Sequence, residues 1–264
     1  MPPHRLDPLF ARRVWGRTDL SAWYRGAPAE TPIGEVWFQG AGGEADPLLL
    51  KMIFTSERLS VQVHPDDAYA ARHHSSRGKT EAWFVLDAAP GARIGMGLKR
   101  RLPAAEVRQA ALDGSIEELL DWRPAVAGQC WLVPARTIHA LGPGLTVFEV
   151  QQNSNVTYRL YDYGRPRELH LERGLAVAEL GPYDMQPRGP HGALAECAYF
   201  RMERLEFSGK IDLAAGADRL LLMLGGRASI GGREMIRGEV WVCEEAEAAR
   251  LEGEAVDLLL AVAL

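Results

Sequence analysis

The feature that most constrains the fold is a succession of short apolar runs separated by Gly, Pro and Asp residues. The runs before residue 180 are LLLKMIF (48–54), LSVQVH (59–64), EAWFVL (81–86), GQCWLV (128–133), LTVFEVQQ (145–152) and VTYRLYDY (156–163). Those after it are YFRMERLEF (199–207), RLLLMLGG (219–226), GEVWVC (238–243) and AVDLLLAVAL (255–264). Each run has the length of a strand, and turn-forming residues lie between them. The pattern predicts an all-β protein, either a sandwich or a barrel.

Three short segments predict helices inserted between the strands. PDDAYAARHHSS has Asp66 in the N-cap position. PAAEVRQAALDG starts with Pro103 at a first-turn position and ends near Gly114. In SIEELL, which follows, Ser115 and Glu118 have the spacing of a capping box.

A stretch rich in Gly and Pro, GPYDMQPRGPHGA (181–193), has no hydrophobic periodicity and predicts a boundary. The chain has 264 residues, which is enough for one large or two small domains. We expect residues 1–180 to form the larger unit and residues 194–264 to form a smaller β unit.

Charge and composition argue against several kinds of partner. The net charge of −5 argues against a general nucleic-acid binder, and the most apolar stretch, 255–264, is too short to span a membrane. The cysteines are widely spaced without a CxxC pair, so neither a disulfide framework nor a thiolate zinc site is indicated. The N-terminal segment lacks the apolar core of a signal peptide. We therefore expect a cytoplasmic protein, and the sequence carries no indication of its oligomeric state.

Polar side chains interrupt two of the apolar runs at positions that share a face. Gln62 and His64 lie two residues apart, so both point to the same side of their strand. Glu81 opens the run EAWFVL and shares a face with Trp83. A polar group on an apolar strand either faces water or has a specific partner. Partners elsewhere in the chain decide between these alternatives.

The segment GQCWLVPARTIHALG supplies such a partner. It has a Gly, then Pro134, and then His139 at the spacing of the second sequence motif of the cupin superfamily, which it resembles. In cupins this His is a metal ligand on a small jelly-roll barrel. The resemblance therefore implies a cupin-type jelly roll for this chain. The superfamily has Gly where this chain has Arg136.

Together, Gln62, His64, Glu81 and His139 offer two imidazoles, one carboxylate and one amide oxygen. This set suits a borderline divalent cation such as Zn²⁺, with positions left open for water or substrate. Each residue alone has an ordinary explanation as a core or surface residue. The four at strand ends predict a metal site.

Four longer blocks narrow the resemblance. LLLKMIFTSERLSVQVHPDD, GKTEAWFVL, VPARTIHALGPGL and FEVQQNSNVTYRLYDYGRPRELH resemble the short bacterial form of the type I mannose-6-phosphate isomerases. The similarity runs from about Leu48 to Leu171 and extends more weakly to RVWG and GEVW. It implies an isomerase that interconverts mannose 6-phosphate and fructose 6-phosphate, with one zinc ion per chain.

The same resemblance implies roles for individual residues. The family motifs that bind zinc match the four residues named above as a metal site. The arginine of the YR pair is the catalytic residue of the family, which implies Arg159. Family lysines that line the pocket match Lys51 and Lys79.

The chemistry of aldose–ketose isomerisation fits these residue types. A proton moves between C1 and C2 through an enediol, whose negative oxygens a metal ion and Arg159 would stabilise. Lys79 could be the base if burial and nearby cations lower its pKa toward neutrality. Pairing with Glu81, or holding the phosphate, is an equal alternative for Lys79. For Lys51 we expect contact with the substrate.

Two other functions fit part of the pattern. Two histidines and a carboxylate also form the open site of cupin Fe(II) dioxygenases, which need neither the lysines nor the YR block. A non-catalytic cupin that binds a sugar would keep the pocket but lose the metal ligands or Arg159. Both sets are present here, so we favour the isomerase.

Overall fold

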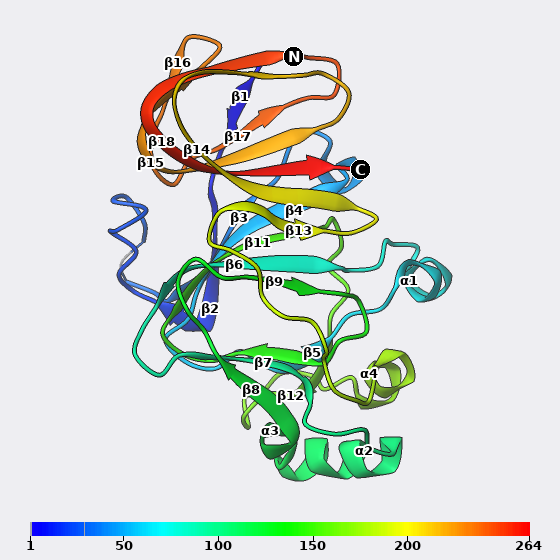
Figure 1. The fold of residues 1–264 in the computed structure, drawn as a ribbon. Helices are drawn as coiled ribbons and strands as arrows, with labels where there is room; N and C mark the ends of the chain where they lie inside the picture. The colour runs from blue at the N-terminus through cyan, green and yellow to red at the C-terminus, as the bar shows by residue number, and fades with distance from the viewer. Residues whose placement is uncertain (1, 29) are drawn as a thin grey trace.

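The computed structural model describes residues 2–28 and 30–264. Three antiparallel sheets dominate it, and the helices are short insertions between strands (Figure 1). The prediction of a mostly β protein with short inserted helices is confirmed.

Two of the sheets face each other and form the lower part of Figure 1. The six-stranded sheet has, in spatial order, β2 (Leu9–Arg17), β3 (Ile33–Phe38), β4 (Leu48–Phe54), β11 (Leu145–Gln152), β6 (Glu81–Ala88) and β9 (Cys130–Val133). The five-stranded sheet has β12 (Tyr158–Tyr161), β5 (Val61–Val63), β10 (His139–Leu141), β7 (Arg93–Leu98) and β8 (Leu120–Pro124). An apolar core that includes Ile53, Val85, Ile94 and Leu141 joins the two sheets.

The third sheet lies at the top of Figure 1, where both termini are found. Its spatial order is β1 (His4–Leu6), β17 (Val240–Cys243), β15 (Arg219–Ile230), β18 (Ala249–Ala263), β14 (Phe200–Leu213) and β13 (Gly192–Glu196), and β16 (Arg233–Met235) pairs with β15. The N-terminal strand β1 thus pairs with β17 of the C-terminal region. The division into residues 1–180 and 194–264 stays a proposal, and this pairing crosses it.

Strand alternation explains how the six-stranded sheet is buried on both faces. In β4, Leu50 and Met52 belong to the core shared with the C-terminal sheet, whereas Ile53 belongs to the core shared with the five-stranded sheet. Since side chains alternate along a strand, Lys51 faces the five-stranded sheet together with Ile53. The same alternation turns Glu81 of β6 inward with Val85. Polar side chains are thereby placed inside the sandwich.

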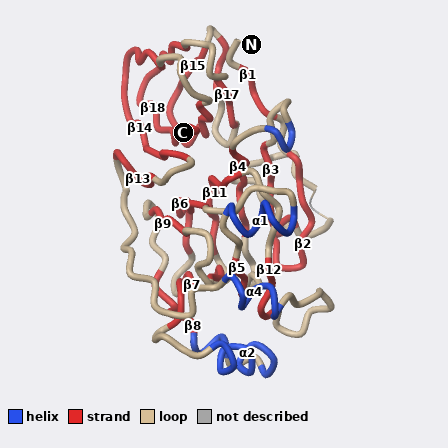
Figure 2. Tube along the Cα trace, turned by 90° about the vertical axis from the view of Figure 1, so that its right-hand side faces the viewer, coloured by secondary structure: helices blue, strands red, loops and turns tan. Residues whose placement is uncertain are grey.

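Helix α1 (Asp67–His74) begins as predicted. The side chain of Asp66 is the N-cap and accepts a hydrogen bond from the backbone N–H of Tyr69 at 2.9 Å. Helices α1 and α4 (Leu171–Val177) lie on one side of the sandwich, at the right in Figure 1 and toward the viewer in Figure 2.

The second and third predicted helices form with different ends. Helix α2 (Ala104–Asp113) has Pro103 as its N-cap rather than in its first turn, and Gly114 ends it in the left-handed region at φ 87°. Before α3 (Ile116–Leu119), the hydroxyl of Ser115 donates to Asp113. Because that carboxylate takes the hydroxyl, the predicted capping box does not form. A short 3₁₀ turn, η1 (Gly43–Ala45), precedes β4.

None of the helices in residues 2–28 and 30–264 is long and apolar enough to cross a membrane.

Candidate metal centre and its pocket

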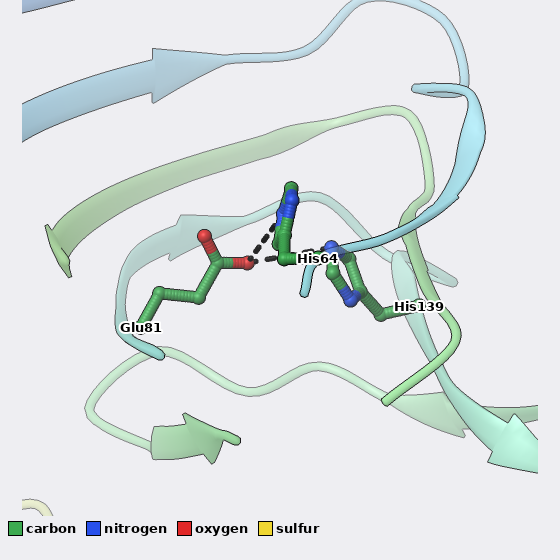
Figure 3. Close-up of side chains that lie close together, drawn as sticks. All are labelled: His64, Glu81 and His139. Atoms are coloured by element: carbon green, nitrogen blue, oxygen red, sulfur yellow. Dashed lines mark ion pairs between the residues drawn. The ribbon is translucent and has the colours of Figure 1, made fainter. Parts of the chain in front are cut away.

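Three of the predicted ligands meet at one end of the sandwich. His64 follows β5, while Glu81 and His139 are the first residues of β6 and β10. Oε1 of Glu81 lies 3.6 Å from Nε2 of His64 and 3.3 Å from Nε2 of His139. Figure 3 shows the carboxylate turned toward both rings. All three side chains are almost completely buried. Such burial excludes the explanation that they are solvated surface residues.

Hydrogen bonds fix how the two imidazoles face Glu81. Nδ1 of His64 lies 3.1 Å from the carbonyl oxygen of Val156, and Nδ1 of His139 lies 2.8 Å from that of Thr137. A carbonyl oxygen can only accept, so each Nδ1 carries the hydrogen and each Nε2 offers its lone pair to the cluster. Burial lowers the pKa of both histidines, that of His64 to about 4. Both rings are therefore neutral near pH 7, as metal ligands must be.

Unpaired atoms at the centre of the cluster fit a divalent cation. Oε1 of Glu81 and Nε2 of His139 are buried, and neither has a hydrogen-bond partner among the described residues. Leaving buried polar atoms unpaired costs free energy, and a cation would remove that cost. Two imidazole nitrogens and a carboxylate oxygen within 4.8 Å of one another form a donor set that divalent transition metals accept.

Gln62, the fourth predicted ligand, lies beside the cluster. It is the cross-strand partner of His139 on β10 and of Arg159 on β12. Directly opposed residues on neighbouring strands share a face, so the three side chains form a row across the sheet. Gln62 is half-buried and lines the same pocket as Arg159. Its role as a ligand stays a prediction.

A pocket of about 290 Å³ opens beside this row. The two predicted lysines, Lys51 and Lys79, line it together with Gln62 and Arg159. The two sheets both contribute walls, because Lys51 comes from the six-stranded sheet and Arg159 from the five-stranded one. The volume suits a ligand of the size of a sugar phosphate.

Lys79 lies against the cluster, and its surroundings keep it protonated. Its ammonium forms an ion pair with Glu81 and lies 3.1 Å from Nε2 of His64 and 3.9 Å from Oε1 of Glu149. Burial on its own would lower the pKa of Lys79, but Glu149 and Glu81 raise it above its ordinary value. A role as a base requires a lowered pKa for Lys79, whereas these protein groups raise it.

Lys51 is occupied by protein partners. Its ammonium donates to Glu149 at 3.2 Å and to Oε1 of Gln151 at 2.5 Å, and it lies 4.7 Å from the ring centroid of Trp37. The side chain is only 8% exposed. Lys51 therefore reaches the pocket wall with few hydrogen-bonding positions left.

Glu149 is a pocket residue that the sequence interpretation missed. One of its carboxylate oxygens faces both lysines, and the other accepts from Nε1 of Trp83 at 2.8 Å. Glu149 and Gln151 are two residues apart in LTVFEVQQ, so both face inward. The alternation argument that identified Glu81 applies equally to this run and could have found them.

Arg159 has free hydrogen-bond donors. One of its terminal nitrogens, Nη1, donates to the backbone carbonyl of Glu168 at 2.7 Å, while its Nε is buried without a partner among the described residues. Burial and, next, the charge of Arg167 lower the pKa of Arg159. A half-buried guanidinium with unused N–H groups beside a pocket is placed to bind a negative oxygen.

The departure from the cupin motif at Arg136 has a structural consequence. Its φ is 75°, in the left-handed region where glycine is favoured. Its backbone N–H donates to the carbonyl of His64 at 2.7 Å, so the turn holds the segment that carries a ligand. The side chain pairs with Asp66 at 3.5 Å and Glu179 at 2.9 Å.

Sequence comparisons show which known proteins this chain resembles. No family model matches the chain. The mannose-6-phosphate isomerase of Streptococcus mutans is 34% identical over 226 residues, which cover 79% of this chain and 71% of the relative. The mannose-6-phosphate isomerase ManA of Bacillus subtilis is 31% identical over 283 residues, which cover 90% of this chain and 88% of the relative.

Solved structures show the same architecture, which confirms the predicted cupin-type fold. The crystal structure of the mannose 6-phosphate isomerase from Bacillus subtilis superposes with a TM-score of 0.85 at 25% identity, and 99% of each chain is covered. A mutant phosphomannose isomerase from Salmonella typhimurium gives a TM-score of 0.76 at 13% identity, with 100% of both chains covered. At that identity, the second likeness supports the fold alone.

Proposed function

Because this chain belongs to the mannose-6-phosphate isomerase family, we propose that it interconverts mannose 6-phosphate and fructose 6-phosphate with the help of a divalent cation. The observation that carries the proposal is the buried cluster of His64, Glu81 and His139 at the edge of a pocket lined with cations. A pocket of this kind suits an anionic sugar whose reacting oxygens become negative.

We assign the metal to Nε2 of His64, Oε1 of Glu81, Nε2 of His139 and the amide oxygen of Gln62, with one Zn²⁺ per chain. When bound there, the cation would supply positive charge that stabilises the oxygens on C1 and C2 of the enediol. The hydrogen bonds from Nδ1 of each histidine to a backbone carbonyl orient the rings for this task.

We assign Arg159 to stabilise the same two enediol oxygens. Its Nε has no partner among the described residues, and it lies on the strand next to Gln62. Its N–H groups would donate to the enediol oxygens more strongly than to the neutral sugar, because negative charge develops there only during the reaction. Arg159 would thus increase turnover more than affinity.

Lys79 is the second residue assigned to the chemistry. Its ammonium lines the pocket and is held by Glu81 and Glu149. From this position, Nζ can donate a proton to a sugar oxygen on C1 or C2 and take it back. Lys51, fixed by Glu149 and Gln151, would contact the substrate along the opposite wall.

The test is an isomerase assay on the purified protein. Mannose 6-phosphate is supplied and fructose 6-phosphate is measured, before and after removal of metal by a chelator and after return of Zn²⁺. We expect activity to fall with the metal and to return with it. Consumption of O₂ without isomerisation would favour the dioxygenase alternative. Binding of the sugar without turnover would favour a non-catalytic cupin.

A further inference from the structure

The negative partners of the cations around the pocket differ in how deeply they are buried. At one end, the ammonium groups of Lys51 and Lys79 face the carboxylates of Glu81 and Glu149. On the adjoining wall, Arg13 pairs with Glu35 at 2.7 Å. Each of these positive charges has a buried or half-buried negative partner. The positive and negative charges of the protein side chains at this end therefore cancel, and a bound metal ion would add positive charge at the cluster.

At the other end of the pocket, three arginines have one buried negative partner, and the charges of Glu57 and Glu168 that also act on them are exposed. Arg159, Arg165 and Arg167 gather around the single buried carboxylate of Asp162. The exposed carboxylate of Glu57 pairs with Arg165 at 2.9 Å. For Arg159 and Arg167, which line the pocket, Asp162 is therefore the buried counter-charge, and the exposed Glu168 also acts on Arg159. Placing two guanidinium groups close together costs free energy unless an anion joins them.

Asp162 holds Arg167 in one orientation. It is only 2% exposed, and its two oxygens accept from Nε of Arg167 at 2.6 Å and from Nη2 at 2.5 Å. This two-point contact fixes the plane of the guanidinium. Nη1 of Arg167 donates to no described residue, and the side chain lines the pocket. The free edge of a fixed arginine is well suited to a phosphate.

The strand order indicates on which side of the pocket Arg167 lies. His139, Gln62 and Arg159 form a row over three adjacent strands, and β12 is the edge strand of its sheet. The backbone N–H and carbonyl of Arg159 bond to His170, so the segment that follows Arg167 flanks the outer side of β12. Arg167, three residues before His170, is therefore placed on the β12 side of the pocket, whereas His139 lies on β10.

We propose that Arg167, oriented by Asp162, binds the phosphate group of the substrate at the end of the pocket opposite the metal cluster. This inference rests on the proposed function for the identity of the ligand as a sugar phosphate. An open-chain hexose 6-phosphate carries its phosphate at the carbon farthest from C1. Phosphate at Arg167 therefore leaves C1 and C2 near the cluster and Arg159. In this arrangement Asp162 is a positioning residue, and Lys51 does not carry the phosphate.

The test compares Arg167→Gln with Arg165→Gln. Both variants remove one charge beside Asp162, but Arg165 does not line the pocket. For Arg167→Gln we expect KM for mannose 6-phosphate to rise about tenfold or more, with kcat within about threefold of the parent. For Arg165→Gln we expect KM to stay within about threefold, since this guanidinium is held by Glu57 and Asp162 and does not line the pocket. Arg167→Lys keeps the charge without the fork and should give an intermediate KM.

A second measurement does not depend on turnover. Inorganic phosphate is titrated against each protein, and protection from thermal unfolding is recorded. We expect protection in the parent and in Arg165→Gln, and its loss in Arg167→Gln. Should the protein fail to isomerise while only Arg167→Gln loses protection, the anion site stands and the proposed function fails. Should Arg167→Gln keep the KM and the protection of the parent, or lose kcat instead of affinity, the assignment of the phosphate is overturned.

Discussion

Oε1 of Glu81 lies 3.3 Å from Nε2 of His139, and each of these buried atoms has no hydrogen-bond partner among the described residues. Burying two acceptor atoms face to face is unfavourable without a positive species between them, since both carry lone pairs once the Nδ1 hydrogen of His139 is committed to Thr137. This relationship makes the metal the first property to test.

We expect the parent protein to bind about one divalent ion per chain and the variants His139→Ala and Glu81→Ala to lose it together with the activity, because an incomplete set of ligands binds a metal far more weakly. Metal content is measured on the purified proteins by elemental analysis. His73→Ala, which removes an exposed histidine of α1, is the control and should keep both metal and activity. Full turnover after exhaustive chelation would contradict the assignment.

Glu149→Gln should destabilise the fold. The carboxylate faces two buried ammonium groups, those of Lys51 and Lys79, and removing its charge leaves both less compensated. Breaking a buried ion pair by removing one partner costs about 3 kcal/mol. The free energy of unfolding is obtained from urea denaturation. Glu172→Gln, whose carboxylate is 79% exposed and pairs with Arg108, should change it by less than about 0.5 kcal/mol. Equal effects of the two substitutions would argue against a structural role for Glu149.

The local periodicity of apolar residues in the sequence predicts much of the fold and part of the site. The run EAWFVL became β6 with Glu81 as its first residue, and Lys51 faces the sandwich interior from the middle of β4. Such features depend on residues close together in sequence, for which the two-residue period is sufficient. The helix that starts after Asp66 is predictable for the same reason, since the capping carboxylate and the N–H of Tyr69 that donates to it are close in sequence.

Sequence periodicity does not predict contacts between residues that lie far apart along the chain. The pairing of β1 with β17 joins residues more than two hundred positions apart, and no local pattern indicates it. The protonated state of Lys79 depends on Glu149, which only the register between β6 and β11 brings near. The missing capping box shows a local failure: Asp113 competes for the hydroxyl of Ser115.

Arg136 offers a test of backbone strain. An L-residue at a φ of 75° is strained by about 1 kcal/mol relative to glycine. Its ion pairs with Asp66 and Glu179 are 42% exposed on the arginine side and contribute about 0.5 kcal/mol. Both substitutions remove the ion pairs. Arg136→Gly also relieves the backbone strain, whereas Arg136→Ala keeps that strain. We therefore expect the Gly variant to be more stable than the Ala variant by about 1 kcal/mol in thermal or urea unfolding. The reverse order would show that the turn has rearranged.

Arg159→Lys should separate catalysis from binding. The guanidinium presents a planar set of N–H groups beside Gln62, which includes the Nε that has no partner in the described part of the chain. A lysine keeps the charge but has a single ammonium, which cannot reproduce the fork. If the fork stabilises the negative enediol oxygens, its loss should lower kcat by about a hundredfold or more while KM changes little. The metal content should stay as in the parent, because Arg159 contributes no ligand.

The steady-state constants of Arg159→Lys and Arg167→Gln are best measured side by side. The two arginines line the same pocket. Burial has the largest effect in lowering the pKa of Arg159, and the nearby charge of Arg167 lowers it further. A general loss of positive potential would raise KM in both variants alike, since it weakens attraction of the dianionic substrate. The assigned roles require opposite patterns, with kcat affected at Arg159 and KM affected at Arg167. If KM alone rises in Arg159→Lys, then Arg159 holds the phosphate, and the group that stabilises the enediol must be Lys79 or the metal.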